Sequence, residues 1–415
     1  MHSTFGKNFN ITIFGGSHED MIGCLIRGFP EEALSFDHDK LQHFLDLRAP
    51  GNSPLATARK EPDKFEIAKI DEINFLKDSA KLSAWKSDLC LIIRNKDRRS
   101  GDYKNLRVVP RPGHADHTAR ARYGNELNMA GGGPFSARMT APLCMAGGIA
   151  LQFLERQGIK IGAHLLCAGD IYDRYFEPMS PEIDEAIAAT ERTIGKASVV
   201  NGSAGSNGSA EADGAAGSAG ANETTGAGHE KISSAGARNI LPALDSSAGE
   251  KMAAEILRAR EDLDSLGGIV EVAAGGLPAG IGGAMYDGLE SLLAPIYFGI
   301  PAVKGVEFGA GFSAAHMRGS NNNDAYTVTN GNVTTKTNNA GGILGGITTG
   351  MPFIARLAFK PTPSIARQQC SVDLEKMEET TLEIKGRHDP CVAVRAVPIV
   401  MAATALGIMD AMLGQ

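Results

Sequence analysis

One stretch of the chain limits its architecture more than any other. Residues Asn201 to Lys231 contain no valine, isoleucine, leucine, methionine, phenylalanine, tyrosine or tryptophan, and alanine, glycine and serine dominate them. Such a segment cannot bury enough apolar surface to offset the entropy lost on ordering. Because the strand and helix patterns on its two sides read as one continuing fold, we interpret residues 198–247 as a flexible insertion within a single domain that spans 1–415.

The chain as a whole has the composition of a globular protein. Hydrophobic residues make up 43% of the 415 residues and charged residues 21%, which excludes global disorder and allows a large core. The net charge of -7 argues against nucleic acid or an anionic membrane as a partner. Any anion must therefore be bound by a local group of cationic side chains.

The cysteines and the apolar segments indicate a cytoplasmic protein. Six cysteines are scattered without any CxxC spacing, which argues against a metal site and fits reduced thiols. The N-terminus lacks the charged and apolar regions of a signal peptide. The longest apolar segment, Val392 to Leu413, contains Arg395, Pro398 and Asp410, so we predict a buried helix rather than a membrane span.

Strand and helix signals follow one another in a mixed, non-alternating order. Strands are predicted at 9–14, 21–28, 89–93, 159–171, 268–274 and 302–308. Helices are predicted at 37–47, 141–156, 183–193, 252–265, 285–298 and 392–413. Asp37 is the predicted N-cap of the first helix. This order favours an α+β fold over a doubly wound parallel sheet.

The segment from Arg111 to Thr140 carries the strongest functional signal. Pro112 and Gly113 place His114 on a turn beside Asp116, where an imidazole can act as an acid or a base. A glycine run at 131–133 then lets the backbone approach a ligand without an intervening side chain. Each half alone also fits an ordinary loop. Together with the nearby arginines they indicate a site for an anion: Arg111, Arg120, Arg122 and Arg138.

Three later motifs fit either a site or an ordinary structural element. Residues Gly341 to Gly346 do not follow the GxGxxG dinucleotide pattern, and they fit tight packing as well as backbone laid against a flat ligand. Residues Lys360 to Ser364 offer a cation and two hydroxyls to a phosphate or a polar ring edge, or else form a surface turn. On a strand, Arg387 and Asp389 would point to one face, where they share a site or make a structural ion pair.

These motifs, in this order, closely resemble those of the chorismate synthase family. The resemblance covers nearly the whole chain except the insertion, and it rests on five segments: 14–18, 111–116, 340–346, 360–365 and 386–391. It implies a β-α-β sandwich, with helices between two mostly antiparallel sheets, assembled as a homotetramer. The implied reaction is the 1,4-anti elimination of phosphate from 5-enolpyruvylshikimate 3-phosphate to give chorismate, the last common step of aromatic amino acid biosynthesis in the shikimate pathway.

The resemblance also implies cofactors. The reaction is redox-neutral overall but needs reduced FMN, with NADPH as the ultimate reductant and with a separate flavin reductase as one source of the reduced flavin. The positions that match flavin contacts of the family are Pro134, Phe135, Ser136, Pro301, Ala302, Gly345, Lys360, Pro361, Thr362, Pro363, Ser364 and Arg387.

Catalytic roles follow from the same resemblance. His18 would protonate the departing phosphate, His114 would manage a proton at the flavin, and Asp389 would take part in removing the ring hydrogen. Ser17 and Ser136 would relay protons or orient these groups. The arginines that match binders of the substrate phosphate or of NADPH are Arg48, Arg111 and Arg138.

The chain departs from the family pattern at several positions. Where the family has Gly-Glu-Ser-His-Gly, this chain has Gly16 for the glutamate and Glu19 for the last glycine. Leu47 and Pro54 stand where arginine is common, and Pro134 follows the triple glycine. Two alternatives therefore remain: a family member that binds flavin without lyase activity, and a flavin oxidoreductase that uses NADPH.

Overall fold

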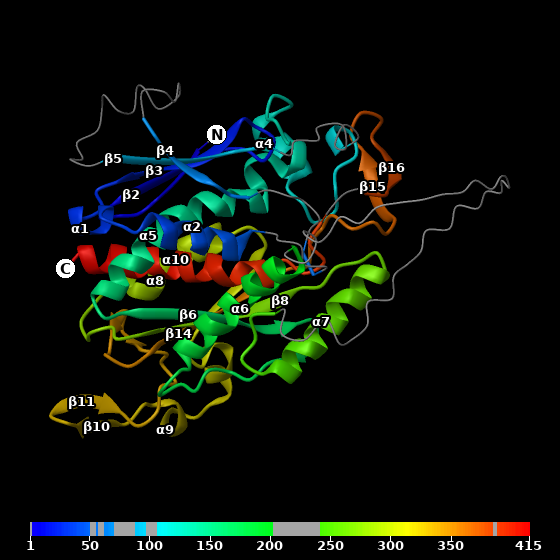
Figure 1. Cartoon of the computed structure of the whole chain (residues 1–415). Helices are drawn as coiled ribbons and strands as arrows, with labels where there is room; N and C mark the ends of the chain where they lie inside the picture. Colours follow the sequence, from blue (N-terminus) through cyan, green and yellow to red (C-terminus); the bar gives the residue numbers. More distant parts are fainter. Residues whose placement is uncertain are drawn as a thin grey trace, which may run out of the picture.

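The computed structural model describes residues 2–49, 55–56, 62–69, 88–96, 106–201, 241–384 and 388–415. These residues form three layers: a five-stranded sheet, a layer of helices and a second five-stranded sheet (Figure 1). All strand pairs within both large sheets are antiparallel. The predicted α+β sandwich, with helices between two antiparallel sheets, is therefore confirmed.

The first sheet is built mainly from the N-terminal hundred residues. Its order is β1-β2-β3-β5-β4. Period-two alternation divides β3 between two faces: Ile22, Cys24 and Ile26 join the main core, whereas Leu25 packs in a small cluster on the outer face. The strands are β1 (His2–Phe5), β2 (Asn10–Gly15), β3 (Met21–Arg27), β4 (Phe65–Ala68) and β5 (Asp88–Arg94).

The second sheet has the order β7-β6-β8-β14-β9. Val270 and Val272 point into the main core, and Ala273 lies on the outer face, where α6 (Ile183–Asn201) packs. The single strand predicted at 159–171 is wrong, because a turn at Gly169 and Asp170 divides it into two strands. The strands are β6 (Lys160–Ala168), β7 (Ile171–Tyr172), β8 (Gly268–Gly275), β9 (Val303–Phe308) and β14 (Phe353–Phe359).

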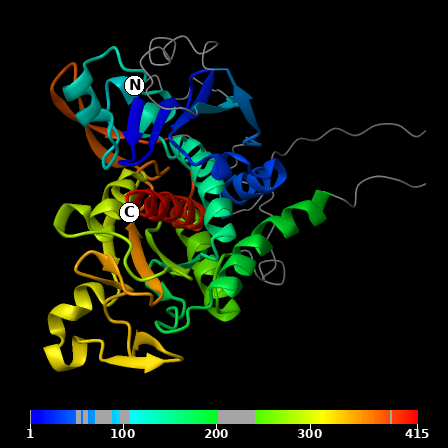
Figure 2. The same ribbon diagram turned by 90° about the vertical axis from the view of Figure 1, so that its left-hand side faces the viewer.

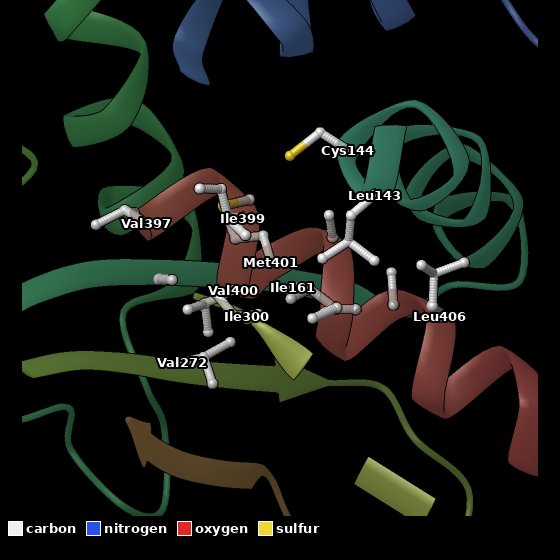
Figure 3. Packing of buried hydrophobic residues seen from close by; sticks show 14 of the residues in the cluster. Leu143, Cys144, Ile161, Val272, Ile300, Val397, Ile399, Val400, Met401 and Leu406 are labelled. Carbon is white, nitrogen blue, oxygen red and sulfur yellow. The ribbon is translucent and has the colours of Figure 1, made fainter. Parts of the chain in front are cut away.

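The central layer consists of α2 (His38–Arg48), α5 (Thr140–Arg156), α8 (Leu289–Gly299) and α10 (Ala393–Leu413). Asp37 caps α2 as predicted, since its carboxylate accepts hydrogen bonds from the backbone of Asp39 and Lys40. Figure 3 shows apolar side chains of α10 packed between α5 and the second sheet. By length and composition α10 could cross a membrane, but 89% of that apolar window is buried within the molecule, as predicted for a core helix.

Smaller elements surround these layers. The β10–β11 hairpin projects from the second sheet, and the β15–β16 hairpin lies near α4 (Figures 1 and 2). The predicted helix at 285–298 is in fact a short 3-10 turn followed by α8. The remaining elements are α1 (Glu31–Leu34), α4 (Asp116–Tyr123), α7 (Ser246–Glu261), α9 (Gly319–Asn322), β10 (Tyr326–Thr329), β11 (Asn332–Thr335), β12 (Ile343–Leu344), β13 (Ile347–Thr348), β15 (Gln369–Asp373) and β16 (Glu378–Leu382), with 3-10 turns at Ala130–Phe135, Ala137–Met139, Met285–Asp287 and Gly311–His316.

Both ends of the predicted insertion at 198–247 belong to the folded part of the chain. Helix α6 continues to Asn201, and α7 begins at Ser246. Leu241 and Leu244 are buried, so the chain returns to the core before α7. Residues 202–240 lie outside the described residues. The apolar run 241–244 is the signal that the sequence interpretation overlooked.

Helices α5 and α10 approach each other through small residues, which gives a stability prediction. A Cβ added to Gly147 would lie 2.3 Å from the Cβ of Ala402. We expect Gly147→Ala to force these helices apart and to lower the free energy of unfolding by about 1–3 kcal/mol. Thermal unfolding followed by circular dichroism measures this. Gly299→Ala is the matched control, because no atom lies within 4 Å of its added Cβ, and an equal loss in both variants would contradict the close-packing argument.

Candidate active site

The glycine run at 131–133 lies between the two histidines that the sequence marks as catalytic. All three glycines have positive φ angles of 62°, 92° and 51°, which favour glycine strongly. A Cβ at Gly131 would lie 2.1 Å from Cε1 of His18, and one at Gly132 would lie 3.2 Å from Nε2 of His114. No side chain larger than hydrogen fits there without displacing an imidazole. The loop thus makes room for both rings.

The same loop brings the two predicted serines to the histidines. The Cβ position at Gly131 is 3.0 Å from Oγ of Ser17, and that at Gly132 is 3.4 Å from Cβ of Ser136. Ser17 is almost fully buried in the turn between β2 and β3. Four of the five predicted catalytic residues therefore lie around one loop: Ser17, His18, His114 and Ser136.

His114 is held in one orientation by a buried ion pair. Asp116 accepts hydrogen bonds from Nε and Nη2 of Arg111, both at 2.7 Å, and lies 2.9 Å from Nδ1 of His114. Burial alone would raise the pKa of the Asp116 carboxyl, but hydrogen bonds from Arg111 and His114 lower it well below its ordinary value. Nδ1 of His114 also lies 3.1 Å from Nη2 of Arg111, so a donor and an acceptor both hold this side of the imidazole. Its Nε2 is left facing Gly132.

The loop at 360–364 packs against this cluster, although it comes 250 residues later. Nη1 of Arg111 donates to Oγ of Ser364 at 3.1 Å, and Nζ of Lys360 donates to the carbonyl oxygen of Gly113. Burial, together with the charge of Lys304, lowers the pKa of Lys360. The predicted flavin positions 301–302 and 360–364 meet here, since the backbone N–H of Lys360 donates to Ala302 O at 2.9 Å.

Two buried polar atoms beside this cluster have no hydrogen-bond partner among the described residues: Oγ1 of Thr362 and Nε2 of His388. Burial, reinforced by the nearby charge of Arg111, lowers the pKa of His388 to about 4, so its imidazole is neutral at neutral pH. A buried polar atom without a partner is costly, and a polar ligand would satisfy both atoms.

Arg48 and Arg138 share one buried carboxylate that the sequence interpretation did not single out. Nη1 of each guanidinium binds one oxygen of Asp63, whose side chain is fully buried. Burial would raise the pKa of Asp63, but the two guanidinium charges lower it. Arg48 also donates from Nε to Oγ1 of Thr140 at 3.0 Å. Two of the three arginines predicted to bind phosphate, Arg48 and Arg138, are thus fixed by an internal anion.

Asp389 lies next to this group. Nη1 of Arg395 donates to Oδ2 of Asp389 at 2.8 Å, and Nε of Arg395 donates to the carbonyl oxygen of Arg48 at 3.1 Å. The start of α10 therefore connects Asp389 to the end of α2. Arg387 and Pro54, both singled out in the sequence, lie outside the described residues.

Comparison with known proteins identifies the family. Residues 9–413 match the family model described as chorismate synthase. The chain belongs to the chorismate synthase family. It is 40% identical over 412 residues to a chorismate synthase of Lancefieldella parvula, covering 99% of this chain and 96% of that protein. It is 38% identical to a chorismate synthase of Korarchaeum cryptofilum, covering 98% and 96% of the two chains.

A solved structure confirms the fold of this chorismate synthase family member. The crystal structure of a chorismate synthase matches it with a TM-score of 0.63 and 22% sequence identity, covering 99% of this chain and 93% of that chain. The family consists of lyases in aromatic amino acid biosynthesis.

Two departures from the chorismate synthase pattern meet in space. A Cβ at Gly16 would lie 3.2 Å from Oε1 of Glu19, so the Glu19 side chain folds back over the glycine. The glycine at position 16 and the glutamate at position 19 therefore shape one turn, and the exposed carboxylate of Glu19 covers the space beside Gly16.

Gly345, one of the predicted flavin positions, does not lie beside the other predicted flavin positions of this chain. Gly345 is exposed in the turn between β12 and β13. Its neighbour Gly346 packs against Gly282 and Gly288, beside the first turn of α8. Since α8 and α10 run antiparallel, with Leu293 against Gly407 and Tyr297 bonded to Thr404, this turn lies near the end of α10 opposite Asp389.

Proposed function

We propose that this protein is a chorismate synthase that eliminates phosphate from 5-enolpyruvylshikimate 3-phosphate with bound reduced FMN. The observation that carries the proposal is the glycine loop at 131–133, which places His18 with Ser17 on one side and His114 with Ser136 on the other. An elimination needs one group to protonate the leaving phosphate and another to manage the proton that is removed, and this loop supplies two separate imidazoles.

The surrounding charges suit a phosphorylated dicarboxylate. Arg48, Arg111 and Arg138 are buried and oriented by carboxylates before any ligand binds, and a preorganised guanidinium stabilises an anion with little further reorganisation. We assign the phosphate and carboxylate groups of the substrate to these arginines. In this assignment Asp63 and Asp116 orient them.

Each residue then has a role in the elimination. His18 donates a proton to the phosphate oxygen as the carbon–oxygen bond breaks. Asp389, oriented by Arg395, accepts the proton that leaves the ring. His114 is held at Nδ1 by Asp116 and Arg111 and exchanges a proton at Nε2, while Ser17 and Ser136 orient the two imidazoles. One phosphate and one proton leave, which balances the conversion to chorismate.

The residues that would hold FMN fit a polar, anionic cofactor. Oγ1 of Thr362 and Nε2 of His388 are buried polar atoms that have no hydrogen-bond partner within the described part of the chain. Lys360 supplies a cation on the same loop as Thr362. Ala302 has a φ of +77°, a strained conformation for a residue with a side chain. We assign FMN to 301–302, 360–364 and 134–136, where it would supply a transient electron to the substrate. NADPH or a separate reductase would keep it reduced.

One anaerobic experiment tests this function. Protein, dithionite-reduced FMN and 5-enolpyruvylshikimate 3-phosphate are mixed, and chorismate absorbance and phosphate release are followed together. Both signals should rise in equal amounts without net flavin oxidation. Flavin binding without either product would instead indicate a family member that lacks lyase activity. Steady NADPH consumption with an oxidised product would indicate an oxidoreductase.

We also propose that the chain acts in the cytoplasm as a homotetramer, whose contacts include the β10–β11 hairpin. Tyr326, Val328 and Val333 are each about two-thirds exposed or more, and Val328 pairs directly with Val333. An isolated two-stranded hairpin with an uncovered apolar face is marginal in water, and a second copy would cover this face.

This assembly predicts the effect of one charge. Val328→Asp should shift the protein to a smaller assembly in light scattering coupled to gel filtration, because it buries a carboxylate in an apolar contact. Thr329→Asp is the matched control, since Thr329 is an exposed neighbour that points to the opposite face of the hairpin. Unchanged mass for Val328→Asp would exclude this face from the assembly.

A further inference from the structure

Asn95, which directly follows β5, binds the turn that carries His18 in three ways. Its backbone N–H donates to the carbonyl oxygen of Asp20 at 3.0 Å. Its side-chain Nδ2 donates to the carbonyl oxygens of Gly16 at 3.1 Å and Glu19 at 2.9 Å. Only 5% of Asn95 is exposed. One buried amide therefore holds both sides of the turn between β2 and β3.

The other polar atom of this amide binds an arginine of the site. Oδ1 of Asn95 accepts a hydrogen bond from Nε of Arg138 at 3.2 Å, while Nη1 of Arg138 binds Asp63. Carbonyl oxygens only accept and guanidinium nitrogens only donate, so the amide has a single orientation that satisfies all partners. Neither a carboxylate nor an aliphatic side chain at position 95 would replace both its donors and its acceptor.

We propose that Asn95 is a positioning residue that fixes the imidazole of His18 relative to the guanidinium of Arg138. The inference rests on the proposed function, in which Arg138 binds the substrate's phosphate and His18 protonates it. The two groups belong to segments more than a hundred residues apart, and the Asn95 side chain links the backbone on both sides of His18 to the guanidinium of Arg138. A displacement of about 1 Å between such groups can cost about a hundredfold in rate.

The test is an amide-to-acid exchange. Asn95→Asp keeps the acceptor for Arg138 but turns a carboxylate oxygen toward two carbonyl oxygens, which opens the turn. We expect kcat for chorismate formation to fall by about a hundredfold, with KM for the substrate changed less than about threefold, because Arg138 keeps its partners. Should this variant not fold, Asn95→Ser, which keeps one donor, replaces it with a smaller expected loss.

Gln152→Glu is the matched control. This amide on α5 is also buried, and it also binds backbone, since Nε2 donates to Asp37 O at 3.0 Å and Oε1 accepts from Asp37 N at 2.8 Å. Within the described part of the chain, the side chain of Gln152 makes hydrogen bonds only to Asp37, which lies outside the site. Its thermal stability should fall like that of Asn95→Asp, while kcat stays within about twofold of the wild type.

A second readout does not depend on catalysis. Carbon-labelled histidine reports the Cε1–H resonance of His18, assigned with His18→Gln, as inorganic phosphate is added. Phosphate should shift this resonance in the wild type and in Gln152→Glu, and should shift it less than about half as much in Asn95→Asp, because phosphate still binds at Arg138 while the His18 imidazole is displaced from it. The positioning role is overturned if the phosphate-induced shift of the His18 resonance, or kcat, is the same in Asn95→Asp as in Gln152→Glu. It is also overturned if phosphate does not shift the His18 resonance of the wild type. If phosphate shifts the His18 resonance of the wild type but the wild type forms no chorismate, the proposed function is wrong. The positioning role is then still supported by the His18 resonance.

Discussion

Replacing His114 by alanine is expected to lower turnover by about a hundredfold or more while the fold stays intact. That loss is typical when a positioned acid–base group is removed. The side chain of His114 is 14% exposed and lies at the edge of the site rather than in the apolar core, so its removal leaves little cavity. Single-turnover chorismate formation with reduced FMN measures the effect, and circular dichroism checks the fold.

Two further variants sharpen this prediction. His117→Ala, three residues along and exposed on α4, should keep the wild-type rate. Asp116→Asn should lower turnover as well, because its amide nitrogen can donate to Nδ1 of His114 and thereby favour the tautomer with hydrogen on Nε2. An unchanged rate in His114→Ala would remove this histidine from the mechanism.

The largest stability effect is expected at His164, in a row of alternating charges across the second sheet. His164, Glu271, Arg356 and Glu307 are cross-strand partners in successive strands β6, β8, β14 and β9. His164 lies 3.1 Å from both Asp173 and Glu271 and is fully buried. Burial alone would lower the pKa of His164, but the two carboxylates raise it above its ordinary value of 6.5.

We expect His164→Phe to lower the free energy of unfolding by about 3–5 kcal/mol at pH 6, because it leaves two buried carboxylates without their shared cation. Since the folded pKa is raised, the contribution of His164 is complete below pH 6.5 and is lost as pH rises through the folded value. The difference between wild type and variant should therefore shrink in alkaline solution, where neutral His164 has one N–H and can donate to only one of the two carboxylates.

Urea unfolding at pH 6 and at alkaline pH measures this difference. His43→Phe is the control, because His43 pairs with Glu191 on the surface with half of its side chain exposed, and such pairs contribute at most about 1 kcal/mol. A stability difference for His164→Phe that does not change with pH would mean that packing, and not the charge of the imidazole, accounts for the loss.

Local patterns made much of the fold predictable. The cap at Asp37, the helix of small apolar residues from 141 to 156 and the buried C-terminal helix depend on neighbours within a few turns of chain, and the structure confirms all three. The predicted boundaries failed where a short apolar run such as 241–244 could be judged only from its burial against other segments.

The site was predictable only as a set of separate motifs. The spacing of Arg111, His114 and Asp116 within one turn revealed their cluster, because the partners are at most five residues apart. The roles of Asp63 and Asn95 could not be predicted, because their partners lie far along the chain. Arg138, for example, is separated from Asp63 by 75 residues. An isolated aspartate or asparagine in a sequence carries no sign of such a contact.

Helix α10 follows, in chain order, the elements that it packs against, and this order has a consequence for folding. Its residues are translated after α5, α8 and the second sheet, yet they pack between these three (Figures 1 and 3). Near its end, the buried carboxylate of Asp410 also accepts hydrogen bonds from the backbone N–H groups of Lys7 and Asn8. A nascent chain that still lacks α10 therefore has an open apolar interior, and it becomes resistant to aggregation only once this helix has been added.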